Sequence, residues 1–122
     1  MRLIPVLFVF SLLFFSCHHD EGDFVIINAS DFDIDSLSIV PDFKNQQLSL
    51  NKNQQKKLTT NMNRVSSDGS YRIIYKNKKN DNFEDISFGY YTNGSQIEKR
   101  ILVTITNDTI IAKSEFYLNY KN

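Results

Sequence analysis

The side chains most often used for catalysis and metal binding lie together near the start of this chain. Cys17 is the only cysteine, and the only two histidines, His18 and His19, follow it directly. Residues 20–122 therefore offer no Ser-His-Asp or Cys-His arrangement for nucleophilic catalysis and no His or Cys ligand for zinc. Paired carboxylates could still hydrolyse a glycosidic bond, but most acids fall in expected turns and in the N-terminal segment. The sequence predicts a protein that is not an enzyme and needs no cofactor.

The residues before Cys17 have the composition of a secretory signal. Arg2 supplies a positive charge, and Leu3 to Phe15 form an almost wholly apolar run of 13 residues that contains Pro5. A membrane-spanning helix needs about 20 apolar residues. The run therefore predicts a signal peptide rather than a permanent span.

The segment Leu13-Phe14-Phe15-Ser16-Cys17 resembles the lipobox of bacterial lipoproteins, in the relaxed form of Bacteroides-type bacteria. The resemblance implies a small outer-membrane lipoprotein that is cut before Cys17 and carries a lipid such as palmitate on that cysteine. A simple signal peptide with an incidental cysteine is the alternative.

The lipoprotein interpretation divides the chain into three parts. Residues 1–16 would be the signal peptide, residues 17–23 an acidic tether and residues 24–122 the folded domain. His18, next to the cysteine, implies transfer to the outer membrane. The acidic cluster that follows is similar to a surface-export signal of Bacteroides-type lipoproteins, so the periplasmic and surface faces both stay open.

Residues 24–122 have the pattern of short strands separated by turn residues. Apolar residues alternate with polar ones, and no segment keeps a helical period over ten or more residues. Asn93-Gly94 is a strong hairpin signal. The spacing predicts an all-β protein, an antiparallel β-sandwich of about seven or eight strands. The expected strands cover 24–28, 34–40, 48–50, 58–62, 71–76, 83–92, 97–106 and 109–118.

The segment from Asp68 to Ile73 resembles the tyrosine corner of immunoglobulin-like and fibronectin-like sandwiches, with Tyr71 as the tyrosine. The resemblance implies an immunoglobulin-like sandwich.

Charge is unevenly distributed along the chain. Residues 17–42 hold seven acids and no Lys or Arg, whereas residues 43–80 hold nine bases and one acid. An acidic strand can lie beside a basic neighbour in a sheet, or the basic stretch can form a patch for an anionic partner. The near-zero net charge argues against nucleic acid as a partner.

Three groups of residues are candidates for binding or modification. Alternation along 83–92 predicts that Phe88 and Tyr90 face the core and that Tyr91 faces solvent. The candidate ligand-binding residues are Tyr91, Asn93, Lys76, Lys78 and Lys79. Calcium could bind Asp31, Asp33 and Asp35, but the sequence favours a solvated acidic edge over a metal site. Asp35-Ser36-Leu37 and Asp108-Thr109-Ile110 resemble the O-glycosylation motif of Bacteroides-type exported proteins, which implies modification at Ser36 or Thr109.

These features favour a membrane-anchored binding or structural module of the cell envelope, whose partner is another envelope protein or a glycan. An envelope inhibitor of a lysozyme or protease and a glycan-binding surface lipoprotein are the alternatives.

The lipid anchor predicts the behaviour of one variant. Cys17→Ser should stop incorporating labelled fatty acid and should leave the membrane fraction, because the thiol that accepts the lipid is gone. Fatty-acid labelling followed by fractionation measures both effects. A variant that stays unprocessed and membrane-bound would contradict the anchor.

Overall fold

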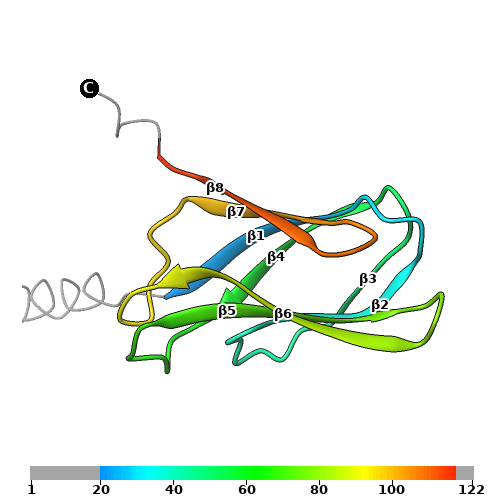
Figure 1. Ribbon diagram of the computed structural model, residues 1–122. Helices are drawn as coiled ribbons and strands as arrows, with labels where there is room; N and C mark the ends of the chain where they lie inside the picture. The colour runs from blue at the N-terminus through cyan, green and yellow to red at the C-terminus, as the bar shows by residue number, and fades with distance from the viewer. Residues whose placement is uncertain (1–19, 118–122) are drawn as a thin grey trace, which may run out of the picture.

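The computed structural model describes residues 20–117, so the signal peptide, Cys17 and the two histidines lie outside the described residues. Within 20–117 the chain forms eight strands (Figure 1). They are β1 (Glu21–Asn28), β2 (Ile34–Val40), β3 (Leu48–Leu50), β4 (Gln55–Asn61), β5 (Gly69–Asn77), β6 (Asn82–Tyr91), β7 (Arg100–Ile105) and β8 (Ile110–Glu115). No helix in this range has the length and apolar character that crossing a membrane requires.

The strands form two four-stranded sheets that pack face to face, which confirms the predicted β-sandwich. The strand orders are β4-β1-β7-β8 and β3-β2-β5-β6. All neighbours are antiparallel except β1 and β7, which run parallel. The resemblance to immunoglobulin domains does not extend to this order. Their second and third strands lie in different sheets, whereas β2 and β3 pair within one sheet here.

The fold begins earlier than the predicted boundary at residue 24. β1 starts at Glu21, and the carbonyl of Asp20 accepts a hydrogen bond from the Met62 backbone N–H, at 2.9 Å. The predicted tether of residues 17–23 is therefore too long, because its last three residues belong to β1 and pair with β4 in an antiparallel register. Acidic residues can form a strand when their backbone N–H and C=O groups are hydrogen-bonded to a neighbouring strand.

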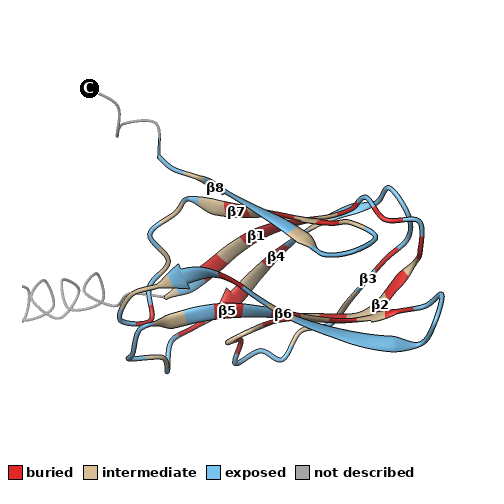
Figure 2. Cartoon of the chain, viewed as in Figure 1, coloured by how far each residue is buried: buried red, intermediate tan, exposed pale blue. Residues whose placement is uncertain are grey.

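The core follows from the alternation of apolar residues on both sheets (Figure 2). Phe24 and Ile26 of β1 and Tyr71 and Ile73 of β5 are each at most 2% exposed. Phe24 joins the two sheets, since its ring meets Tyr71 edge-on at a centroid distance of 5.0 Å and Phe88 at 5.8 Å. Such pairs add about 0.5–1.5 kcal/mol beyond burial.

Tyr71 lies in this core, but it does not form a tyrosine corner. Its hydroxyl makes no hydrogen bond within the described residues, whereas the hydroxyl of a tyrosine corner bonds to backbone a few residues upstream. Burial raises the pKa of the Tyr71 hydroxyl, and the nearby Glu98 carboxylate raises it further. Tyr71 therefore contributes through its ring rather than through a hydroxyl bond.

Asn28, at the end of β1, ties three chain segments together although it is fully buried. Its side-chain amide donates to the carbonyls of Phe32, at 2.8 Å, and Leu50, at 3.2 Å. Its side-chain oxygen accepts from the backbone N–H and the hydroxyl of Ser30. The amide thus gives buried backbone groups hydrogen-bond partners and fixes the crossing from β1 to the other sheet.

Replacing Asn28 should therefore be costly. Asn28→Ala should lower the free energy of unfolding by about 2–4 kcal/mol, because it leaves several buried polar groups without partners. Urea denaturation measures the change. Asn107→Ala is the control, since Asn107 is exposed and its side chain accepts one bond, from the Asp31 N–H at 2.8 Å. Similar losses in both variants would contradict the role of Asn28.

Candidate functional site

The residues that the sequence predicts to bind a ligand do not form one site. In the register of β5 with β6, Gly69 pairs with Tyr91 at one end and Asn77 pairs with Asn82 at the other. Tyr91 and Asn93 therefore lie at the end of the sandwich where β1 begins, whereas Lys76, Lys78 and Lys79 lie at the opposite end. Eight residues of strand, about 26 Å, separate the two groups.

The predicted orientation of the two tyrosines is also wrong. Tyr90 is 53% exposed, while Tyr91 packs against the core with its ring centroid 5.2 Å from that of Tyr71. The cause is a β-bulge, because the register of β6 shifts by one residue between Phe88 and Tyr91. Gly89 has a φ of +63° there, a conformation that glycine adopts without strain. Phe88, which precedes the bulge, is buried as predicted.

The three aspartates proposed for calcium do not converge. Asp31 pairs with the ammonium of Lys79 at 3.5 Å, and Asp33 accepts the Lys52 backbone N–H at 3.0 Å. Residues 20–117 contain no cluster of three or more His, Cys, Asp or Glu placed to hold a metal ion. The calcium hypothesis therefore finds no support in this part of the chain.

The acidic and basic stretches of the sequence do lie side by side, as one interpretation predicted. Asp35 of β2 is the register partner of Lys76 of β5, and Asp31 pairs with Lys79. The Ser49 hydroxyl is the main cause that lowers the pKa of the Asp35 carboxyl, helped by the Ser36 N–H and by nearby lysines. One ion pair within residues 20–117 therefore joins the two stretches, whereas Lys76 and Arg72 pair with Asp81 and Asp85, which lie outside the acidic stretch.

The two O-glycosylation candidates differ in their surroundings. Thr109 is exposed in the turn between β7 and β8, where its backbone N–H donates to the Thr106 hydroxyl at 3.1 Å. Ser36 is partly buried at a bulge of β2 with a φ of +53°. Thr109 is the more accessible acceptor, and its modification stays a prediction.

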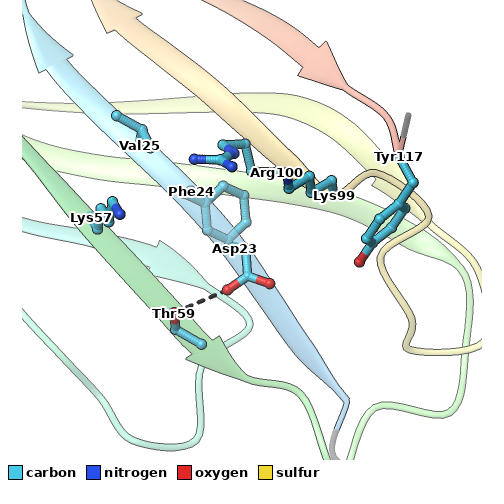
Figure 3. Close-up of a pocket in the computed structure, with 8 residues that line it drawn as sticks. All are labelled: Asp23, Phe24, Val25, Lys57, Thr59, Lys99, Arg100 and Tyr117. Carbon is cyan, nitrogen blue, oxygen red and sulfur yellow. Dashed lines mark hydrogen bonds between the residues drawn. The ribbon is translucent and has the colours of Figure 1, made fainter. Parts of the chain in front are cut away.

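A cavity on the outer face of the β4-β1-β7 sheet is the better candidate site (Figure 3). Its volume is about 310 Å³, at the lower end of the range for small-molecule pockets. Strands β1 and β4 form the floor, Lys99 and the start of β7 form one wall, and Tyr117, after β8, lies at one side of the open cavity. The lining residues are Asp23, Phe24, Val25, Lys57, Thr59, Lys99, Arg100 and Tyr117.

Strand pairing explains why these side chains meet. Asp23 and Val25 point outward because Phe24 between them points into the core. Antiparallel pairing places Thr59 opposite Asp23 and Lys57 opposite Val25. The parallel pairing of β1 with β7 aligns Phe24 with Ile101, so that the start of β7, with Lys99 and Arg100, lies beside Asp23.

Positive charge dominates the lining of this cavity. Three basic side chains line it, Lys57, Lys99 and Arg100, against one acid, Asp23. Arg100 pairs with Glu115 at 2.9 Å, whereas neither lysine has an ion pair within residues 20–117. Asp23 is held in place, because its carboxylate accepts the Thr59 hydroxyl at 3.0 Å and its backbone N–H donates to the Gln96 side chain at 2.7 Å.

This arrangement suits an anionic ligand of small size. Lysine ammonium groups bind carboxylates, sulfates and phosphates, and the Tyr117 ring offers an apolar surface with a polar edge. The cavity has no local signature in the sequence, because its lining residues come from four separate segments.

Comparison with models of protein families, with curated proteins and with solved structures found no match for this chain.

The bulge at Gly89 makes a testable distinction between two adjacent tyrosines. Tyr91→Ala should lower the free energy of unfolding by about 2 kcal/mol, because it removes a ring packed against the core. Tyr90→Ala should change it by less than about 0.5 kcal/mol, as exposed substitutions usually do. Thermal or urea unfolding of both variants measures the difference. The reverse ranking would restore the alternation predicted from sequence.

Proposed function

We propose that this protein is a non-enzymatic, lipid-anchored module of the outer membrane that captures an acidic glycan in the cavity on the β4-β1-β7 sheet. The observation that carries the proposal is the meeting of Lys57, Lys99 and Arg100 around a cavity of about 310 Å³. The lipobox-like segment ending at Cys17 supports the anchor.

The absence of catalytic residue types supports a binding role. Residues 20–122 contain no histidine and no cysteine, which are the usual bases and nucleophiles of hydrolases. The one lining acid, Asp23, is hydrogen-bonded to Thr59 rather than to a second carboxyl. A pair of acids as in glycosidases is therefore missing from the cavity lining.

An acidic sugar fits the cavity better than a neutral one. The ligand's carboxylate would meet Lys57 and Lys99, whose charges have no ion pair within residues 20–117. Its hydroxyls could bond to Asp23 and Thr59, and its apolar face could lie against the Tyr117 ring. The volume admits one sugar residue, so further residues of a chain would extend over the sheet.

Removing the two unpaired charges tests the proposal. Calorimetric titration with galacturonic acid oligosaccharides should show binding, and Lys57→Gln with Lys99→Gln should raise Kd about tenfold or more, because a charged hydrogen bond contributes about 1.5–3 kcal/mol. Binding should also weaken as salt rises.

The matched control is the double variant Lys78→Gln with Lys79→Gln, which removes the same charge at the opposite end of the sandwich. It should leave Kd unchanged. If the control abolishes binding and the cavity variant does not, the ligand binds near the lysines predicted from sequence. No binding of acidic or neutral oligosaccharides would refute glycan capture.

A further inference from the structure

Exposed apolar side chains gather at the end of the sandwich where β1 begins. Of the seven large apolar side chains exposed in residues 20–117, two lie toward the other end, Phe83 near the β5–β6 turn and Ile111 near the β7–β8 turn. The remaining five are Phe43, Tyr90, Ile97, Phe116 and Tyr117. We call these five the apolar end.

Backbone contacts place the first members of the apolar end beside the start of the fold. The Phe43 N–H donates to the Asn61 carbonyl at 2.9 Å, and Asn61 is the register partner of Glu21. Ile97 follows Ser95 by two residues, and the Ser95 hydroxyl donates to the Asp20 carboxylate at 3.1 Å.

The other members come from the ends of β6 and β8. Tyr90 precedes Tyr91, which pairs with Gly69 at the start of β5. Phe116 and Tyr117 follow Glu115, which pairs with Arg100 at the start of β7. These ends and the loop from Thr92 to Lys99 lie around the first residues of β1 (Figure 1).

The position of Cys17 makes a membrane the natural occupant of this surface. Only three residue steps separate Cys17 from Asp20, and three extended residues span at most about 11 Å. A lipid on Cys17 would therefore hold the apolar end within reach of the lipid headgroups. A protein partner would have to enter this narrow space, whereas the membrane surface is already there.

We propose that the apolar end rests on the membrane surface, with its side chains at the level of the lipid headgroups. The inference rests on the proposed lipid anchor at Cys17. Aromatic rings with a polar tip, such as those of Tyr90 and Tyr117, suit the boundary between water and lipid. Exposed apolar groups of this kind mark protein or membrane contacts.

Charge does not drive this contact. The bases Lys44, Arg64 and Lys99 lie at the same end as the acids Asp20, Glu21, Asp42, Asp68 and Glu98. The Arg64 guanidinium also lies 5.5 Å from the centroid of the Phe43 ring. Because acids outnumber bases at this end, no excess of positive charge attracts it to lipid headgroups. Docking therefore depends on burial of apolar area and should persist at high salt.

The chain contains no tryptophan, so a tryptophan introduced at one position is the only indole that emits. Two isoleucines of similar exposure therefore give a matched pair of positions. Ile97 at the apolar end is 56% exposed and Ile111 on β8 is 58% exposed. Ile97→Trp and Ile111→Trp are made in the chain from residue 17 onward, which keeps every strand and every core residue described above. Circular dichroism first checks that both variants fold.

Cys17 is the only cysteine, so its thiol can be coupled to a maleimide lipid in phosphatidylcholine–phosphatidylethanolamine vesicles. This coupling tests docking whether or not the cell lipidates the cysteine. With brominated lipid present, Ile97→Trp should lose about half its emission and shift to shorter wavelength, since interfacial side chains lie about 5–10 Å deep. Ile111→Trp should keep the emission of a water-exposed indole, and high salt should change neither result.

Equal, water-like emission from both variants on the vesicles would overturn the proposal. Equal quenching of both would also overturn it, because the sandwich would then lie on its side. Failure of the lipid anchor is a separate result, visible as missing fatty-acid label on Cys17 in cells, and it would not alter the vesicle measurement.

Discussion

The placement of β1 between β4 and β7 is the constraint on which the rest of the structure depends. Antiparallel pairing with β4 and parallel pairing with β7 satisfy both edges of the strand. Its inward side chains, Phe24 and Ile26, then reach the opposite sheet, and its outward side chain Asp23 forms part of the cavity floor. The same pairing brings the chain into the fold at one end. Core and cavity therefore share one strand, and the apolar end lies around the start of that strand.

The core must carry the stability of the sandwich, since its described residues contain no cysteine and hence no disulfide. The rings of Phe24, Tyr71 and Phe88 join the sheets at one end, and the Asn28 amide bonds to the connecting segments at the other. Each end is thus closed by a different kind of interaction. Burial of apolar area supplies most of the free energy, while the buried amide fixes which segments meet.

The strands and their inward faces could largely be predicted from sequence, because alternation is a local signal. The predicted inward and outward faces were wrong after Gly89, where a β-bulge shifts the register of β6. The positive φ of Gly89 that accompanies this bulge cannot be recognised from the pattern of apolar residues. The predicted start of the domain is too late because the acidic residues Glu21 and Asp23 are not typical of a strand. Pairing with β4 nevertheless includes both residues in β1. The cavity could not be predicted, because the parallel pairing that aligns β1 with β7 joins residues about eighty positions apart.

The cavity and the apolar end meet at one residue, and this limits how a ligand could arrive. Tyr117 lines the cavity and also belongs to the apolar end, so a docked sandwich would hold the cavity beside the membrane surface. A long glycan could then approach only along the sheet face, from the side away from the lipid. Lys57, in the middle of β4, would be met before Lys99, which lies nearer the membrane. The anchor would thus determine the direction of capture as well as its location.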